Sequence, residues 1–578
     1  MKDGSFTADR LLALYDRVAE AEDAIPRLRR FVLDLAVRGK LVEQDPSDEP
    51  AAELLKRIAI ERNARVKCGE IRKGKPNDPV EARPWDTPSR WVWLPLGDTG
   101  NIFTGNSIDA ATRERLEKTT EGRPFVATKD VGYGLDPIAY ENGLLVSASD
   151  SSFKVARANS VLICAEGGSA GRKIGLTDRE ICFGNKLLAN ETWSVVSPRY
   201  VLFVYQSRAF YEQFVEQMTG VIGGISINKF LRLPFPLPPL AEQRRIIAKV
   251  DELMALCDRL EGARAGREAV RDQLTNATMT RLTALETDME TFPTHARVAL
   301  KTLSTLTTRP DQIKTLRQTI LNLAVRGKLV AHDPTEGHGD DVIAAIATYK
   351  SVRSSTRADS TLIDFDPPDG WALHSLDTIT LDGPKNGLSP TRTEDQTAPK
   401  AITLTATTSG QFDGRHFKHV NVTYEQAEPF WLEPDDLLFQ RGNTPEYVGM
   451  AAIYDGRAKE YLYPDLIMRV RIVKEMDLRF VHLWCISPVG RAYLTANATG
   501  AQKTMPKINQ GVLRALPIMI PPLAEQHRIV AKVDALMALC DQLESSLTTA
   551  ATTRSRLLEA LLHEALGGAP GDQTEAAA

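Results

Sequence analysis

Two segments far apart in this chain are near copies of each other. Residues 238–261 read PPLAEQRRIIAKVDELMALCDRLE, and residues 521–544 read PPLAEQHRIVAKVDALMALCDQLE. A second pair repeats at a similar separation of about 285 residues, because LAVRGKLV at 35–42 recurs at 323–330. Solenoid repeats have periods of about 20 to 50 residues, so a period near half the chain indicates a duplicated module with internal pseudo-two-fold symmetry. Such a molecule suits a partner that is itself two-fold.

Length and composition predict a folded chain of three or four domains, since 578 residues with 43% hydrophobic side chains can bury several cores. Apolar stretches fall far short of the roughly 20 residues of a membrane span, and the polar start MKDGSFTADR does not resemble a signal peptide. We therefore expect a cytoplasmic protein without a membrane partner. The 71 basic and 75 acidic residues give a net charge of −4, so any affinity for nucleic acid must come from local patches.

The six cysteines are scattered without a CxxC pair, which speaks against a disulfide framework or a zinc site. We expect no metal bound by this chain. Cys257 and Cys540 occupy the same position of the repeat, and both are predicted to be small buried helix residues.

Each copied segment predicts a long helix with one apolar stripe. Proline at the start of both segments fits a first helical turn, where its missing N–H would be unpaired anyway. The apolar residues follow at spacings of four and three, which places them on one face. We expect the two stripes to pack on each other as a helix-pair interface of Ile246, Val250, Leu253, Cys257 and Leu260 with Ile529, Val533, Leu536, Cys540 and Leu543.

The LAVRGKLV segments also predict helices, each ending at a glycine cap, Gly39 or Gly327. Arg38 and Lys40 favour the negative end of the first helix. One face of each helix is apolar, with Leu28, Phe31 and Leu35 in the first copy and Leu316, Ile320 and Leu323 in the second.

Between the helical stretches, short β-type runs alternate with Gly, Asn and Asp turns, which predicts two α/β globular domains. Their residue identity is low although the helices are near copies, as expected when one scaffold presents two readers of different targets. The predicted class is therefore α+β with a pseudo-two-fold repeat. The expected divisions are an N-terminal helical region 1–88, a globular domain 89–235, a central helical scaffold 236–369, a globular domain 370–517, a distal helix 518–566 and a disordered tail 567–578.

Two motifs resemble enzyme sites but lack the context that those sites need. Residues 69–76, GEIRKGKP, fit a phosphate-binding loop through the lysine, but Pro76 replaces the magnesium-binding Ser or Thr. Residues 167–171, GGSAG, fit a nucleophile elbow, but a strand-like run follows, and the next histidine, His295, falls in the helical region. A glycine-rich hairpin tip explains this second segment better. We find no catalytic constellation and predict a chain that is not an enzyme.

Polar and basic residues in the two globular domains are the remaining functional candidates. Arg and Lys can bond the acceptors of guanine, and Asn can bond adenine bidentately, although most contacts to DNA reach phosphate. The candidates in the first domain are Asn106, Ser107, Arg113, Arg115, Lys118, Arg123, Lys129, Ser169, Arg172, Lys173 and Lys186. The candidates in the second domain are Lys385, Asn386, Arg392, Arg415, His416, Lys418, Arg441, Asn443, Thr444, Lys503 and Lys507.

The order of helix, globular domain, PPLAEQ helix, repeated LAVRGKLV element, second globular domain and second PPLAEQ helix resembles the specificity subunit of type I restriction-modification enzymes. The resemblance covers nearly the whole chain, and the doubled motifs are its most specific elements. DLLFQRGNTPEYVG at 436–449 and YLYPDLIMRVRI at 461–472 also look like that family's target recognition domains. The first domain, 89–235, departs more from the family pattern.

The resemblance implies two target recognition domains held apart by a long antiparallel helix pair, a coiled coil, with each domain reading one half of a split site in double-stranded DNA. It implies two methyltransferase (modification) subunits as partners, joined in some systems by restriction subunits. S-adenosylmethionine, ATP and Mg²⁺ are expected on those partners, with no cofactor on this chain. A different class remains open from the residues alone, namely a coiled-coil assembly scaffold whose globular domains bind proteins.

Overall fold

The computed structural model describes residues 23–72, 77–81, 83–134, 136–219, 223–283, 307–348, 365–499 and 505–566, with eight single positions outside these ranges. The described chain forms two compact units. Unit 1 contains residues 1–267 and 550–578, and unit 2 contains residues 268–549. The boundary between the units crosses both long helices, so each unit combines one globular domain with parts of the helical scaffold.

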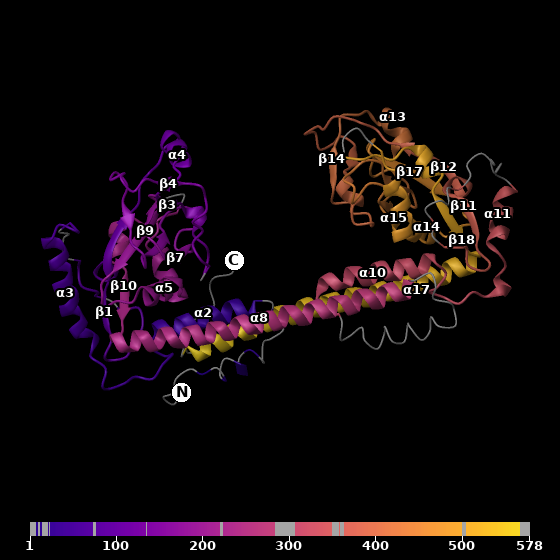
Figure 1. Ribbon diagram of the computed structural model, residues 1–578. Helices are drawn as coiled ribbons and strands as arrows, with labels where there is room; N and C mark the ends of the chain where they lie inside the picture. Colours follow the sequence, from indigo (N-terminus) through magenta and orange to yellow (C-terminus); the bar gives the residue numbers. More distant parts are fainter. Residues whose placement is uncertain are drawn as a thin grey trace. The chain divides into compact units, whose positions relative to one another are not determined.

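Unit 1 is built on an antiparallel four-stranded sheet with the order β2-β9-β6-β7 (Figure 1). A short pair, β1-β10, closes the domain where the chain enters and leaves it. A second sheet, β4-β3-β8-β5, lies beyond the first. The strands are β1 Val92–Pro95, β2 Gly100–Thr104, β3 Arg123–Val126, β4 Leu145–Val146, β5 Val155–Ala156, β6 Val161–Cys164, β7 Ile174–Leu176, β8 Ile181–Phe183, β9 Leu187–Thr192 and β10 Pro234–Leu237.

The helices of unit 1 cover the sheet with apolar faces. The Tyr200, Val201 and Phe203 side chains of α5 are buried in the same core as those of α2. The helices are α2 Ala24–Val37, α3 Ala51–Lys67, α4 Ala110–Glu117, α5 Pro198–Gln206, α6 Arg208–Glu216 and α7 Ile227–Leu231, with short 3₁₀ turns at Leu96–Asp98 and Thr128–Asp130.

Unit 2 repeats this framework. Its four-stranded sheet has the order β12-β17-β15-β16, which corresponds strand by strand to the sheet of unit 1, and the pair β11-β18 corresponds to β1-β10. The strands are β11 Ala372–Ser375, β12 Thr380–Asn386, β13 Lys400–Ile402, β14 Phe417–His419, β15 Leu437–Gln440, β16 Ala451–Ile453, β17 Ile467–Ile472 and β18 Pro517–Ile520. The helices are α10 Pro310–Val325, α11 Gly339–Ala347, α12 Leu376–Ile379, α13 Tyr424–Ala427, α14 Leu478–Ile486, α15 Pro488–Ala496 and α16 Gln510–Arg514, with 3₁₀ turns at Pro334–Glu336, Leu404–Thr407 and Glu428–Phe430.

The long helices α8, Leu240–Thr283, and α17, Leu523–Ala565, begin directly after the last strand of each domain, as the sequence predicts. In unit 1 the last part of α17 lies beside α8, because Leu562 and Leu566 pack on the core that buries Val250 (Figure 1). In unit 2 the last part of α8 meets the start of α10, where Arg309 pairs with Glu268 and Asp272.

Each apolar stripe packs into the core of its own unit, which corrects the predicted interface. Ile246, Val250, Leu253 and Cys257 are buried in the unit 1 core, and Leu260 packs against that core. Ile529, Val533 and Cys540 are buried in the unit 2 core, and Leu536 and Leu543 pack against it. The reason is that α2 and α5 offer one stripe an apolar surface nearby, and α10 and α14 offer the other stripe the same. The prediction that Cys257 and Cys540 are buried is confirmed.

Both predicted glycine caps are present, with φ of +68° at Gly39 and +66° at Gly327. The Lys40 amide donates to the Leu35 carbonyl, and the Lys328 amide donates to the Leu323 carbonyl, which closes each helix end. A Cβ at Gly39 would lie 2.4 Å from Pro88, and one at Gly327 would lie 2.8 Å from Pro368. The repeated glycine therefore ends a helix and also admits the chain that leads into each domain.

A repeated glutamine fixes each domain to its long helix. Gln243 is fully buried, accepts from the Ser197 amide at 2.8 Å and donates to the carbonyls of Val195 and Pro238. Gln526 is also fully buried and accepts from the Asp477 amide at 2.9 Å. Its amide nitrogen donates to the Pro521 carbonyl at 2.9 Å and approaches the Met476 sulfur at 3.7 Å.

Candidate nucleic-acid interface

One end of each four-stranded sheet gathers about half of the predicted site residues, and we call this end the tip edge. Antiparallel strands alternate in direction, so in unit 1 the ends of β2 and β6 meet the starts of β9 and β7 there. The candidates at the tip edge of unit 1 are Asn106, Ser107, Ser169, Arg172, Lys173 and Lys186. Those at the tip edge of unit 2 are Lys385, Asn386, Arg441, Asn443, Thr444 and Lys507.

The glycine-rich segment of unit 1 forms the predicted hairpin tip between β6 and β7. The Ser169 hydroxyl lies 3.2 Å from the Tyr133 hydroxyl, and the Lys173 ammonium lies over the Tyr133 ring at 5.3 Å. The Arg172 guanidinium lies over the Tyr211 ring and donates to its hydroxyl at 2.8 Å. Asn106 spans two backbone groups, because it donates to the Ser152 carbonyl and accepts from the Lys154 amide. These contacts hold polar groups in fixed positions at an exposed edge.

Unit 2 builds its tip on a buried amide. Gln440 is fully buried and donates to the Leu404 carbonyl and to the hydroxyls of Thr407 and Thr408. Its carbonyl oxygen accepts from the Asn443 amide at 2.6 Å, so Asn443 is held by the core.

Beside this amide, the Arg441 guanidinium has one long contact, 3.4 Å, to the Asp465 carbonyl. Two backbone groups of Lys507 bond Thr499. Within the described ranges, no side-chain partner is found for Lys507 or for Lys186 of unit 1.

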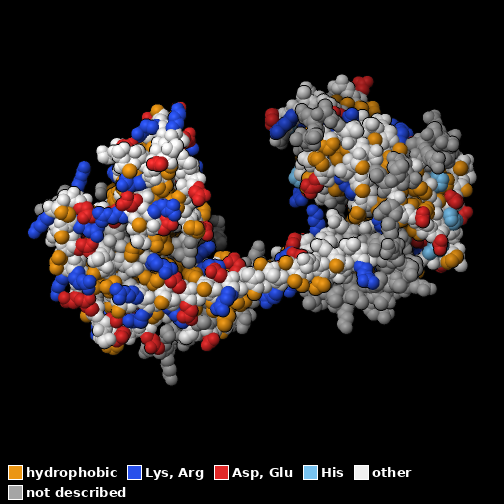
Figure 2. Space-filling model, viewed as in Figure 1, with side chains coloured by type: hydrophobic (Ala, Val, Ile, Leu, Met, Phe, Trp, Pro, Cys, Tyr) orange, Lys and Arg blue, Asp and Glu red, His pale blue; other side chains and the backbone are white. Residues whose placement is uncertain are grey.

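Most candidates away from the tip edges are paired with carboxylates. Ser152 and Arg115 hold the pKa of the Asp150 carboxyl below its usual value, and Arg415 does the same to the pKa of the Asp413 carboxyl. Figure 2 accordingly shows Lys and Arg interspersed with Asp and Glu over unit 1. The pairs are Arg113–Glu117, Arg115–Asp150, Lys118–Glu114, Arg123–Glu180, Arg392–Glu394, Arg415–Asp413 and His416–Asp413, and Lys385 of the tip edge pairs with Asp382.

Lys129 and Lys418 lie in the described part of the chain and carry no side-chain ion pair there. The Lys129 carbonyl accepts from the Lys173 ammonium of the tip edge at 3.3 Å. Lys503 lies outside the described residues, as do the tail 567–578 and residues 73–76 of the phosphate-loop-like segment. The sequence did not predict a role for Tyr133, which is 54% exposed beside the unit 1 hairpin. An exposed aromatic leaves no signal in a sequence until its loop is placed.

The comparisons with known proteins point to one family. Residues 394–552 match the family model described as the type I restriction modification DNA specificity domain. The type I restriction enzyme EcoEI specificity subunit of Escherichia coli is 28% identical over 568 residues, and the alignment covers 94% of each chain. The EcoAI specificity subunit of the same species is 28% identical over 578 residues, again covering 94% of each chain. The chain is thus similar to type I specificity subunits over nearly its whole length.

This similarity confirms the resemblance predicted from the doubled motifs. A chain in a solved structure of a type I restriction-modification system has a TM-score of 0.50 and 16% identity, and the match covers 84% of this chain and 99% of that chain. At this identity the likeness concerns the fold alone. The residues matched by the family model, 394–552, lie almost wholly in unit 2.

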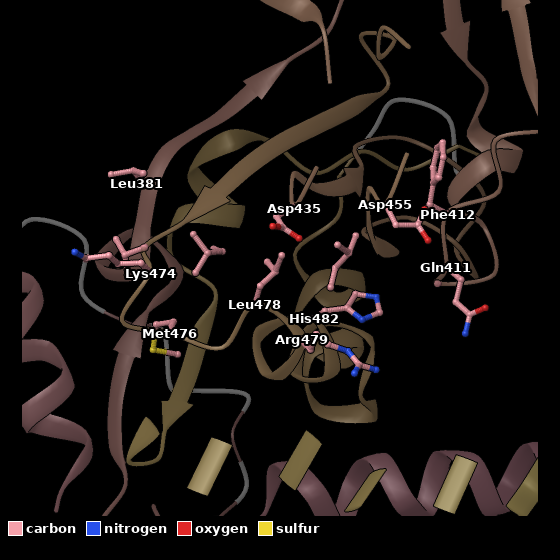
Figure 3. Close-up of a pocket in the computed structure, with 14 residues that line it drawn as sticks. Leu381, Gln411, Phe412, Asp435, Asp455, Lys474, Met476, Leu478, Arg479 and His482 are labelled. Carbon is pink, nitrogen blue, oxygen red and sulfur yellow. The ribbon is translucent and has the colours of Figure 1, made fainter. Parts of the chain in front are cut away.

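The chain also has a pocket of about 1000 Å³ in unit 2, at the end of the sheet opposite to the tip edge. Leu381, Asp435, Arg479 and His482 line it, as Figure 3 shows, and none of the predicted site residues does. Arg479 is paired with Asp534, and burial lowers the pKa of His482, whose ring contacts the Ala451 carbonyl. Arg479 thus serves the attachment of α14 to the long helix, and the tip edge remains the candidate interface.

The described residues contain no group of three or more His, Cys, Asp or Glu side chains arranged to hold a metal ion. None of their helices combines the length and apolar character that crossing a membrane requires.

Proposed function

We propose that this chain is the DNA-recognition subunit of a type I restriction-modification complex and that each tip edge reads one half of a bipartite site. The observation that carries the proposal is that the sheets that hold the tip edges correspond strand for strand in the two units, while their tips carry different polar residues. A repeated framework with divergent tips suits a target whose two halves differ in sequence. The alternative of a protein-binding scaffold gains no support from the specificity subunits to which the chain is similar.

The tips can supply the contacts that such recognition needs. Lys186 and Lys507 are exposed and free to neutralise phosphates, which gives affinity without sequence preference. Amides and guanidinium groups held by core contacts, such as Asn443 and Arg441, are suited to base edges. Because the net charge of the chain is −4, local cations such as these must supply the attraction to DNA.

In this proposal, partner subunits carry out the chemical reactions. Two modification subunits would bind S-adenosylmethionine and transfer the methyl group, and restriction subunits, where the system has them, would use ATP and Mg²⁺. The subunit works in the cytoplasm, where the DNA lies. It takes no catalytic part, and its role is to choose the site.

The long helices are the proposed ruler between the two half-sites. At 1.5 Å per residue, the copied segment of α8 spans roughly 36 Å, about one turn of B-DNA. Inserting one helical turn into both helices, after Arg267 in α8 and after Thr549 in α17, should lengthen the non-specific gap by about 1 or 2 base pairs. Sequencing the methylated sites of the assembled complex measures that gap, and an unchanged gap contradicts the ruler.

The recognition itself is tested by exchanging residues 89–235 for the corresponding domain of another specificity subunit. Methylome sequencing of cells with the exchanged chain should reveal a motif altered in one half only. The unmodified chain is the control, and cells without the chain give the background. A motif altered in both halves, or no motif that depends on this chain, contradicts the proposal.

A further inference from the structure

The two tip edges can be aligned residue by residue through their backbone hydrogen bonds, although their sequences differ. The Ala165 amide donates to the Lys186 carbonyl at 2.8 Å, and the Arg441 amide donates to the Leu466 carbonyl at 2.7 Å. Ala165 and Arg441 therefore occupy one position, and Lys186 and Leu466 occupy another.

A third position follows from the segment that crosses each tip. The Thr219 amide donates to the Gly224 carbonyl at 2.8 Å, and the Thr499 amide donates to the Lys507 carbonyl at 2.9 Å. Gly224 and Lys507 also bridge to corresponding residues, Glu166 and Gly442. All three positions adjoin the end of the central strand, β6 or β15, in the middle of the tip edge.

At each matched position one unit carries a cation and the other a neutral residue. Unit 1 has Lys186 where unit 2 has Leu466, and unit 2 has Arg441 and Lys507 where unit 1 has Ala165 and Gly224. Because the backbones agree, the difference lies in the side chains alone. The side chains at these three positions thus give the shared framework a different binding preference in each unit.

Resting on the proposed function, we infer that Arg441 reads a guanine in the half-site of unit 2 and that Lys186 and Lys507 anchor phosphates. Arg441 is half-buried beside Gly442, and its planar fork has one long contact, so paired N–H donors remain for guanine O6 and N7. A Cβ at position 442 would lie 3.0 Å from the Lys507 side chain, so glycine keeps this space open. Lys186 and Lys507 are point charges on flexible stems, which suits phosphate better than a base.

Unit 1 has no arginine at the matched position that could read a guanine. Its matched residue, Ala165, has no polar side chain, and the nearby Arg172 is occupied by the Tyr211 ring and hydroxyl. No guanine read by an arginine is therefore expected at the corresponding position of the first half-site. Lys186 contributes affinity there without a base preference.

The test uses the full chain assembled with its modification subunit and a DNA library with both half-sites randomised, and the methylated molecules are sequenced. Arg441→Ala and Arg441→Lys should each lower the preference for guanine at one position of one half-site by about 10-fold or more. The lysine variant keeps the positive charge. A loss of guanine preference in that variant therefore shows that the planar guanidinium, and not the charge, reads the base. Lys186→Leu, which copies unit 2, should slow methylation of all sites evenly and reduce the salt dependence of binding by about one phosphate.

Arg415→Ala is the matched control, because Arg415 is exposed and paired with Asp413, and it should leave the motif unchanged. The unaltered half-site reports in each experiment that the variant is folded. If the original chain yields a bipartite motif that both Arg441 variants retain, this inference is wrong and the proposed function stands. If the original chain yields no bipartite motif, the proposed function itself fails.

Discussion

Unit 1 and unit 2 attach their sheets to the long helices through the same set of contacts but end in different tips. Gln243 corresponds to Gln526, and the bidentate pair Arg199–Asp251 corresponds to Arg479–Asp534. Arg29 and Arg317 each pair with two carboxylates of a long helix. Sequence is thus retained where each domain must be held in one orientation, and it diverges where each would meet a different target.

The buried glutamines should give the largest effect on stability. Gln243→Ala leaves the Ser197 amide and two carbonyls without their partner, so we expect unit 1 to lose about 4 kcal/mol. Gln526→Ala should cost unit 2 less, because a methionine sulfur replaces one of the carbonyl acceptors. Hydrogen exchange resolved by unit measures each loss separately. Gln273→Ala, at an exposed position of α8, is the control, and equal protection in all three variants contradicts the role of the junction.

The repeated glycine caps should give the next largest effect. Gly39→Ala forces a side chain into φ +68° and into contact with Pro88, so we expect a loss of about 3 kcal/mol. Gly327→Ala should cost less because Pro368 is farther from the new atom. Gly262→Ala, within α8 and with no atom within 4 Å of the added Cβ, should instead stabilise by about 0.5 kcal/mol. Thermal unfolding gives the order, and a smaller loss at Gly39 than at Gly327 refutes the explanation.

Asp34 makes the two units differ in their response to pH. Its carboxylate is buried and accepts from the Ala209 amide, and burial raises its pKa to about 6, whereas the repeat has Asn322 at this position. Because the pKa is higher in the folded state than in the unfolded chain, folding is most favoured below the unfolded value. Stability then falls as pH rises towards about 6 and stays low above it.

Asp34→Asn should therefore stabilise unit 1 by about 2 kcal/mol at pH 8 and remove its loss of stability between about pH 4 and pH 6. The substituted amide still accepts from Ala209. Unfolding followed across this pH range measures both effects, with unit 2 as the internal control. A variant that keeps the original pH slope shows that another group causes it.

The sequence predicted the parts of the fold that depend on local signals. The proline starts, the heptad spacing and Gly39 with Gly327 specify helices and their ends within a few residues, and all are found. The partner of each stripe was predicted wrongly, because α2 and α5 are as apolar as the second long helix, and periodicity does not identify the partner.

The candidate site shows the same limit. Residues as distant as Asn106, Arg172 and Lys186 share one tip edge only because of strand order, which no local pattern contains. Arg113 was chosen as a candidate for its charge alone. In the structure its guanidinium is already paired with Glu117, one helical turn away. Gln243, which attaches the domain, was part of a recognised repeat but had no predicted role, because burial of a polar side chain depends on backbone groups brought from elsewhere.

The smallest effect on stability should come from the two arginine clamps, the pairs Arg199–Asp251 and Arg479–Asp534. The loss of stability should be the same in both units. Arg199 and Arg479 each form two hydrogen bonds with an aspartate of the long helix, and all four side chains are partly exposed. Solvent screens such pairs, so Arg199→Ala and Arg479→Ala should each cost about 0.5 to 1 kcal/mol, and high salt should reduce the difference from the unmodified chain. Unfolding at low and high salt measures this. A loss of several kcal/mol in one unit alone would mean that this clamp, unlike its counterpart, holds its domain in place, and the equivalence of the two junctions would then fail.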